Sequence, residues 1–227
     1  MKIRFALMLL LVSCGSVSAA EFYPISSVSA STADTDLWPA SNLIQGPGVG
    51  FDAAEPHDKL LGGADGNWVT DAPAGFPSDY IEQVGMPVLT FDLGSDVLLG
   101  EISVWGYAAT NTNGVAEFEL AFATEAQGVG GGSATAGPFT TMGDLATGEN
   151  NDILRQSFSF EPLTARYVQL TATDNFFVAP GDGSGGALAG GDRAGLGEVA
   201  FAVVPEPGSM VLAMFGICGL LAFRRRR

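Results

Sequence analysis

Hydrophobic and polar residues alternate in short runs along the middle of the chain. In the clearest run, residues 116–123, Glu117 and Glu119 alternate with the apolar Phe118 and Leu120. A period of two is typical of a β-strand with one buried face. Runs rich in β-forming residues predict strands at seven places: residues 25–31, 88–93, 101–107, 116–123, 156–160, 166–172 and 198–203.

Clusters of Gly, Pro, Asn and Asp separate these runs, and no helical period of useful length occurs before the last part of the chain. Three longer stretches, residues 46–65, 127–137 and 178–193, are predicted loops. Loops of this length are functional or mobile. The glycine-rich ones lack the Lys and Ser/Thr of a phosphate-binding loop. Many short strands with turn-rich connections favour an all-β antiparallel sandwich.

The N-terminus has the three parts of a secretory signal peptide. Lys2 and Arg4 supply positive charge, residues 5–12 are apolar, and Ala19-Ala20 ends a small-residue cleavage site. We therefore predict a signal peptide over residues 1–20 and a mature chain from residue 21. Residues 11–14 also resemble a bacterial lipobox, in which Cys14 would be lipidated. Cleavage after Ala20 is favoured, because the other end of the chain already supplies an anchor.

The C-terminus combines a Pro-Glu-Pro motif (Pro205, Glu206, Pro207), an apolar run over residues 210–223 and four arginines. As a helix the apolar run would cover roughly 20 Å, less than the ~30 Å of a bilayer core. A span must therefore include neighbouring residues, with the arginines snorkelling. A short transmembrane helix with a cytoplasmic basic end is predicted, which places the preceding residues outside.

This tail resembles the PEP-CTERM sorting signal of Gram-negative bacteria, in which a Pro-Glu-Pro motif, a transmembrane helix and a basic end are recognised by an exosortase-type membrane protease. The resemblance covers residues 205–227. It implies transient anchoring in the inner membrane, followed by placement on the cell surface or in the extracellular matrix. Systems of this kind accompany exopolysaccharide production.

The segment between the two ends, residues 21–204, is long enough for one domain with a substantial core. It contains no cysteine, so no disulfide can stabilise it. Four basic residues stand against 24 acidic ones, a formal net charge of −20. Such a surface repels phosphate backbones, which argues against nucleic-acid binding. It fits solubility in salt or affinity for divalent cations.

An ordered set of short motifs runs through this segment, at residues 25–31, 38–46, 68–70, 89–94, 102–105, 164–170 and 195–199. Together they resemble discoidin domains, also called coagulation factor 5/8 type C domains, of the galactose-binding-like group. The resemblance implies an eight-stranded jelly roll whose loops at one end bind a ligand, most often a sugar in bacterial relatives. Relatives are usually binding modules rather than enzymes.

The same resemblance implies one structural calcium ion between a loop and the last strand. Its matching positions are Asn42, Gln45, Asp65, Asn67 and Glu198. Oxygen ligands of this kind suit calcium, although Gln45 stands where relatives commonly have aspartate. In the alternative interpretation, Glu198 only accepts hydrogen bonds from backbone groups or from Arg166. A catalytic metal is disfavoured, because the chain has a single histidine and no cysteine in this segment.

A sugar site needs an aromatic platform and paired hydrogen-bonding groups. Candidates at loop positions are Trp38, His57, Tyr107, Asn111, Phe176 and Arg193. For each of them a structural role is the simpler interpretation, since aromatic residues in sandwiches mostly lie in the core. Trp68 and Trp105 are expected to be core residues. No pair of carboxylates stands out as a glycosidase pair, so no catalytic residue is predicted.

The sequence thus predicts an exported protein whose β-sandwich binds extracellular carbohydrate without catalysis. An alternative is a structural or protein-binding component of a biofilm matrix that has no specific glycan ligand. Ice binding is a third alternative, which the lack of flat threonine arrays disfavours.

Overall fold

The computed structural model describes residues 22–34, 37–44, 66–107, 112–142, 155–186 and 188–202. The predicted signal peptide, Cys14 and the Pro-Glu-Pro tail lie outside these residues. No helix within the described ranges is long and apolar enough to cross a membrane.

Eight strands, paired antiparallel throughout, make up the described domain, so the predicted all-β antiparallel fold is confirmed. They are β1 (Phe22–Tyr23), β2 (Ser27–Ala30), β3 (Trp68–Val69), β4 (Val88–Gly106), β5 (Val115–Ala123), β6 (Ala134–Thr140), β7 (Arg155–Asn175) and β8 (Gly195–Ala202). Three short helical turns accompany them: η1 (Ala40–Ile44), α1 (Tyr80–Gln83) and η3 (Ser184–Gly186).

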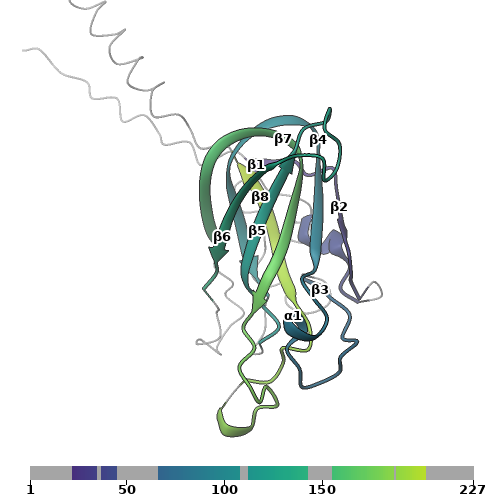
Figure 1. Ribbon diagram of the computed structural model, residues 1–227, viewed down its shortest axis with the longest axis vertical. Helices are drawn as coiled ribbons and strands as arrows, with labels where there is room; N and C mark the ends of the chain where they lie inside the picture. The colour runs from purple at the N-terminus through teal and green to yellow at the C-terminus, as the bar shows by residue number, and fades with distance from the viewer. Residues whose placement is uncertain are drawn as a thin grey trace, which may run out of the picture.

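Strands β4 and β7 form a long ribbon that bends over and divides the sheet into two layers. Residues 88–92 pair with residues 171–167, and residues 101–105 pair with residues 159–155. Between these stretches the register shifts twice, and Gly94 takes a φ of 80°. Figure 1 shows the ribbon arching over the upper end of the molecule. We call this end the arch end.

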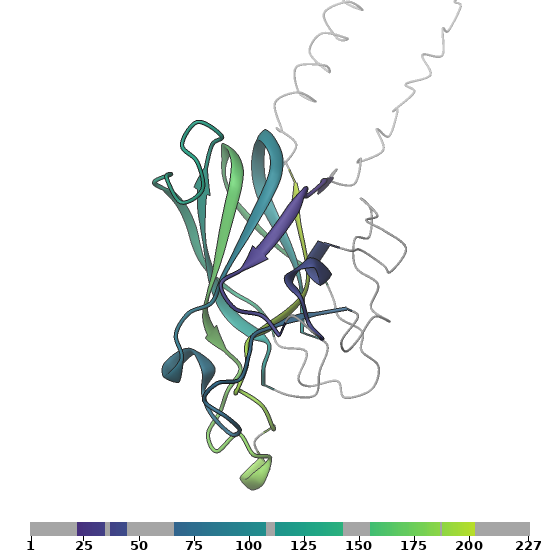
Figure 2. The ribbon, with the colours of Figure 1, turned by 90° about the vertical axis from the view of Figure 1, so that its right-hand side faces the viewer.

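The first half of β4 and the second half of β7 form one layer with β2, β5 and β6. The other halves form the second layer with β8, to which β1 and β3 pair. The opposite end of the molecule carries α1 and the segment 176–194 (Figures 1 and 2). We call it the loop end.

Aromatic rings fill the space between the layers. Phe91 on β4 meets Phe201 on β8 edge to face, with ring centroids 5.4 Å apart. Phe118 on β5 meets Phe158 on β7 at 5.5 Å in the same way. Such T-shaped contacts are favourable beyond the area they bury. As expected from the sequence, Trp68 and Trp105 are also buried.

An ion pair closes the arch end. Arg166 donates from Nε and Nη2 to the two carboxylate oxygens of Asp92, at 2.8 and 3.1 Å, and also pairs with Glu125 at 3.1 Å. The hydrogen bond from Arg166 lowers the pKa of Asp92 below its ordinary value. Arg166 is thus engaged at the arch end and not with Glu198, contrary to one alternative from the sequence.

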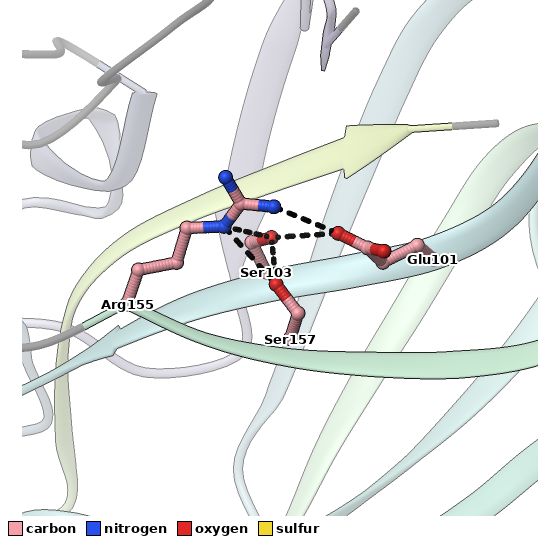
Figure 3. A network of polar contacts seen from close by, with 4 residues as sticks. All are labelled: Glu101, Ser103, Arg155 and Ser157. Atoms are coloured by element: carbon pink, nitrogen blue, oxygen red, sulfur yellow. Dashed lines mark hydrogen bonds and ion pairs between the residues drawn. The ribbon is translucent and has the colours of Figure 1, made fainter. Parts of the chain in front are cut away.

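A second polar network lies on the second layer (Figure 3). Arg155 donates from Nε to the hydroxyl oxygens of Ser103 and Ser157, both at 3.0 Å, and from Nη2 to Glu101 at 3.0 Å. Its guanidinium also lies 4.7 Å from the ring centroid of Phe22, the first residue of β1. The network therefore joins β4 to β7 and holds the N-terminal strand against them.

The two termini of the described domain pair with each other. Phe22 on β1 is the register partner of Ala202, the last residue of β8, and Ala202 is also the partner of Glu101 on β4. In Figure 1 strand β1 lies in the upper part of the molecule, far from α1. The chain therefore enters and leaves this domain away from the loop end.

The structure differs from the predicted elements at three places. The separate strands predicted at 88–93 and 101–107 are one bent strand, and so are those at 156–160 and 166–172. The ladder continues through the bends because bulges absorb the extra residues. The predicted loop 127–137 overlaps β6, which contains Gly137 and Pro138. Strand β6 lies at the edge of its layer, where proline is tolerated.

Candidate functional site

Two buried asparagines fix the long segment 176–194 at the loop end. The side-chain oxygen of Asn113 accepts a hydrogen bond from the backbone N–H of Gly191 at 2.6 Å. The side-chain nitrogen of Asn175 donates to the carbonyls of Gly191 and Arg193 at 3.1 and 3.3 Å. These buried amides satisfy backbone groups of Gly191 and Arg193 and tie the segment to the ends of β5 and β7. Sequence reasoning missed both asparagines. Their only signal in the sequence is that each lies at one end of a run in which polar and apolar residues alternate.

The segment also bonds to α1 and to its own turns. The backbone N–H of Tyr80, the first residue of α1, donates to the carbonyl of Gly191 at 2.7 Å. At the tip, the hydroxyl and the backbone N–H of Ser184 hold the pKa of Asp182 below its ordinary value. The loop end is thus an assembly of several segments held by hydrogen bonds.

Two of the candidate ligand residues, Trp38 and Arg193, lie together at this end. The Arg193 guanidinium lies 5.1 Å from the ring centroid of Trp38. Its Nη1 donates to Asp34 and to the carbonyl of Thr70, both at 3.1 Å. Arg193 therefore stacks on the indole and is neutralised by a carboxylate, so it orients Trp38. We call these four residues the Arg193 cluster.

Two further candidates, Tyr107 and Phe176, lie beside the same segment, and both are close to Gly114. They lie over the bridge between Gly114 and Gly195. A Cβ atom added to Gly114 would stand 3.2 Å from Phe176, and one added to Gly195 would stand 3.0 Å from Tyr107. Both rings are half-buried and pack on bare glycine backbone. This pair and the Arg193 cluster lie around residues 193–195.

Two buried polar atoms at the loop end lack a hydrogen-bond partner within the described part of the chain: Nε1 of Trp38 and the hydroxyl of Thr112. Thr112 belongs to this end because its backbone N–H bonds to the carbonyl of Ala189 at 3.0 Å. Most buried polar groups in proteins are satisfied, so each exception needs a partner outside the described residues, such as a bound water or ligand. The loop end is therefore one place where a ligand group could be accepted.

A groove of about 310 Å³ adjoins the Arg193 cluster. Its lining comes from three segments: Ser31 and Thr32 after β2, Asp71 and Pro73 after β3, and Tyr80 with residues 84–87 before β4. Asp71 follows Thr70, to which Arg193 donates, so groove and cluster share one stretch of backbone. The groove has the size and the mixed polar and apolar lining of a small-ligand site.

Local structure explains why a groove forms there. Asp79 caps α1 by accepting a hydrogen bond from the backbone N–H of Glu82 at 3.1 Å. Gly85, with a φ of 116°, follows the helix and turns the chain toward β4. The end of β2 is tied to the start of β4 by a bond from the Val88 N–H to Ser31 Oγ at 2.9 Å. The helix cap, the glycine turn and this hydrogen bond therefore fix the backbone of the segments that line the groove.

Two of the residues that line the groove are exposed apolar side chains. Val84 and Met86 are 42% and 57% exposed. Apolar side chains at a groove are available to contact a ligand. Sequence reasoning did not find the groove, because its lining comes from three separate segments, residues 31–32, 71–73 and 80–87, with no shared pattern.

The described members of the predicted calcium site are all buried. Asn42 on η1, Asn67 before β3 and Glu198 on β8 are at most 5% exposed. The side-chain nitrogen of Asn42 donates to the carbonyl of Asn67 at 2.7 Å. Because Trp68 pairs with Leu196, the antiparallel register directs Glu198 toward residue 66. No group of three or more His, Cys, Asp or Glu that could hold a metal occurs among the described residues.

Four predicted site residues, His57, Asn111, Gln45 and Asp65, lie outside the described residues, as does the sorting motif. Of the others, the structure brings Trp38 together with Arg193, Tyr107 with Phe176, and Asn42 with Asn67.

Among solved structures, similar domains are carbohydrate-binding modules (CBMs). The family 32 CBM from C. perfringens NanJ in complex with galactose is 15% identical, with a TM-score of 0.49, over 80% of this chain and 97% of that one. The CBM32 of AlyQ, in complex with 4,5-unsaturated mannuronic acid, is 17% identical, with a TM-score of 0.46, over 81% and 98%. A chitosan-binding module from Paenibacillus sp. IK-5 is 13% identical, with a TM-score of 0.47, over 81% and 99%.

Residues 203–227 match the PEP-CTERM protein-sorting motif, which confirms the resemblance read from the tail. A search of curated proteins finds no match.

Proposed function

We propose that this chain is an exported protein that binds extracellular carbohydrate at its loop end without catalysis. The observation that carries the proposal is the groove beside the Arg193 cluster. Its apolar lining residues Val84 and Met86 suit the C–H face of a sugar ring, and its polar lining residues Ser31, Thr32 and Asp71 suit hydroxyl groups. The sorting-motif match supports export, transient anchoring in the inner membrane and processing by an exosortase.

A glycan-array screen of the full-length chain in mild detergent tests this function. We expect a narrow set of glycans to bind, and we expect Trp38→Ala to weaken binding at least about tenfold, because loss of the indole releases Arg193, which holds the carbonyl of Thr70 beside the groove residue Asp71. Leu98→Ala removes an exposed apolar side chain at the arch end and is the control. Folded protein that binds no glycan would refute the proposal and favour a structural role in the matrix.

We further propose that Asn42, Asn67 and Glu198 hold one structural calcium ion with Gln45 and Asp65. The fit rests on the chemistry and placement of the set: amide and carboxylate oxygens are ligands that calcium prefers, and Asn42 already contacts the backbone of Asn67. Bound calcium would connect η1, the backbone before β3 and the last strand.

Calcium should therefore raise the melting temperature of the full-length chain. At a concentration 100-fold above Kd we expect a rise of about 5–10 °C, reversed by a chelator. Glu198→Gln should abolish this rise, whereas Glu119→Gln on exposed β5 surface should keep it. Differential scanning calorimetry with and without calcium measures both. An equal rise in the two variants would refute the assignment.

A further inference from the structure

The charges of the domain limit which sugar the groove can take. Each arginine within the described ranges already faces a carboxylate: Arg155 faces Glu101 at 3.0 Å, Arg166 faces Asp92 at 2.8 Å, and Arg193 faces Asp34 at 3.1 Å. A sugar acid is normally held by a cation, often through a bidentate arginine contact. To hold one here, an arginine would first have to give up its present partner.

The groove itself carries negative charge. Asp71 is the one acidic residue that lines the groove, and it is exposed. Two more acidic residues, Asp79 and Glu82, belong to the cap and first turn of α1, whose Tyr80 also lines the groove, and residues 21–204 as a whole carry a formal net charge of −20. A carboxylate on the ligand would meet like charge both in the groove and on approach.

A carboxylate is well suited to the opposite kind of ligand group. When ionised, Asp71 only accepts hydrogen bonds, and its two oxygens can take donors from two neighbouring ring substituents. Hydroxyl groups supply such donors, and a protonated amino group supplies them together with a positive charge. The apolar side chains of Val84 and Met86 line the same groove and are suited to cover the C–H face of the ring.

We infer that the ligand of this groove is a sugar residue without an acidic group, neutral or amino-substituted, whose hydrogen-bond donors face Asp71. This inference rests on the proposed function and names the substrate class of the same site. Salt distinguishes the two forms, since affinity for an amino sugar falls with ionic strength while affinity for a neutral sugar does not.

Four hexasaccharides test the inference on the full-length chain in detergent: glucosamine, N-acetylglucosamine, galacturonate and mannuronate oligomers, titrated by calorimetry at low and high salt. We expect one or both of the first two to bind, and both uronates to bind at least about tenfold more weakly. Asp71→Asn keeps the shape of the side chain and should weaken the bound sugar by about fivefold to tenfold. Glu161→Gln removes an equal charge from exposed surface near the arch and should change nothing.

The outcomes separate the two claims. Uronate binding as tight as that of the other oligomers would overturn the inference and leave the carbohydrate-binding function in place. An unchanged affinity of Asp71→Asn for the sugar that binds would also overturn the inference and leave the carbohydrate-binding function in place. If neither these oligomers nor the glycan array yields any ligand for the folded chain, the proposed function fails, and the inference with it.

Discussion

Phe118→Ala is expected to lower the free energy of unfolding by about 3–5 kcal/mol. Phe118 has no exposed surface, and its ring meets Phe139 on β6 at 5.4 Å and Phe158 on β7 at 5.5 Å. It therefore contacts both layers of the sandwich. Truncation loses the burial of the ring and leaves a cavity that the paired strands cannot close.

Urea denaturation of the full-length chain, followed by tryptophan fluorescence, measures this loss. Phe76→Ala is the control because that ring is 56% exposed, and we expect it to change the free energy of unfolding by less than about 0.5 kcal/mol. A loss below about 1.5 kcal/mol for Phe118→Ala would mean that the two layers do not depend on this ring.

Gly191→Ala should have the second large effect, centred on the loop end. Gly191 has a φ of 87°, and a Cβ atom there would overlap the ring of Phe177 and stand 2.8 Å from the carbonyl oxygen of Ser78. Its N–H and carbonyl also hold the bonds to Asn113, Asn175 and Tyr80. Left-handed strain and steric overlap together should cost at least about 3 kcal/mol.

Gly185→Ala is a matched control from the same segment. Gly185 also has a positive φ, 63°, but a Cβ atom there would meet nothing within 4 Å. We expect only the strain, about 1–2 kcal/mol. Hydrogen exchange of residues 176–194 reports where each change acts: Gly191→Ala should expose amides across the segment and weaken glycan binding, and Gly185→Ala should do neither. Equal losses of stability in the two variants would show that packing around Gly191 is unimportant.

The sequence predicted strands well wherever one face is buried and the other is not. In β5 the alternation of Glu117 and Glu119 with Phe118 and Leu120 gave the right element and the right buried face. The bends of β4 and β7 were not predicted, because glycines and short polar runs occur both in bulges within a strand and in loops between strands. Strand β6 was not predicted because Gly137 and Pro138 indicate a loop. A strand tolerates them at the edge of a sheet, and the sequence does not show which strand lies at the edge.

The candidate site was predicted only in part, for a different reason. Trp38 and Arg193 were found as residue types suited to sugars, and the structure places them together. Their contact joins residues 155 positions apart, and the groove joins residues 31–32, 71–73 and 80–87. Such contacts between distant residues come from the packing of loops, and loop packing produces no periodic pattern in the sequence. Asn113 and Asn175 likewise act through backbone groups of a distant segment.

The pairing of Ala202 with Phe22 and Glu101 has a mechanical consequence. A pull between a sugar held in the groove and the C-terminal end of β8 would run along the strands, from one end of the molecule to the other. Hydrogen bonds in an antiparallel ladder lie perpendicular to the strands, so the bonds of β8 to β4, from Gly106–Leu196 to Glu101–Ala202, would bear the load together in shear. They would not be opened one after another as in a peeled hairpin. With a sugar bound in the groove, the domain would therefore resist tension along the line from the groove to the C-terminal end of β8.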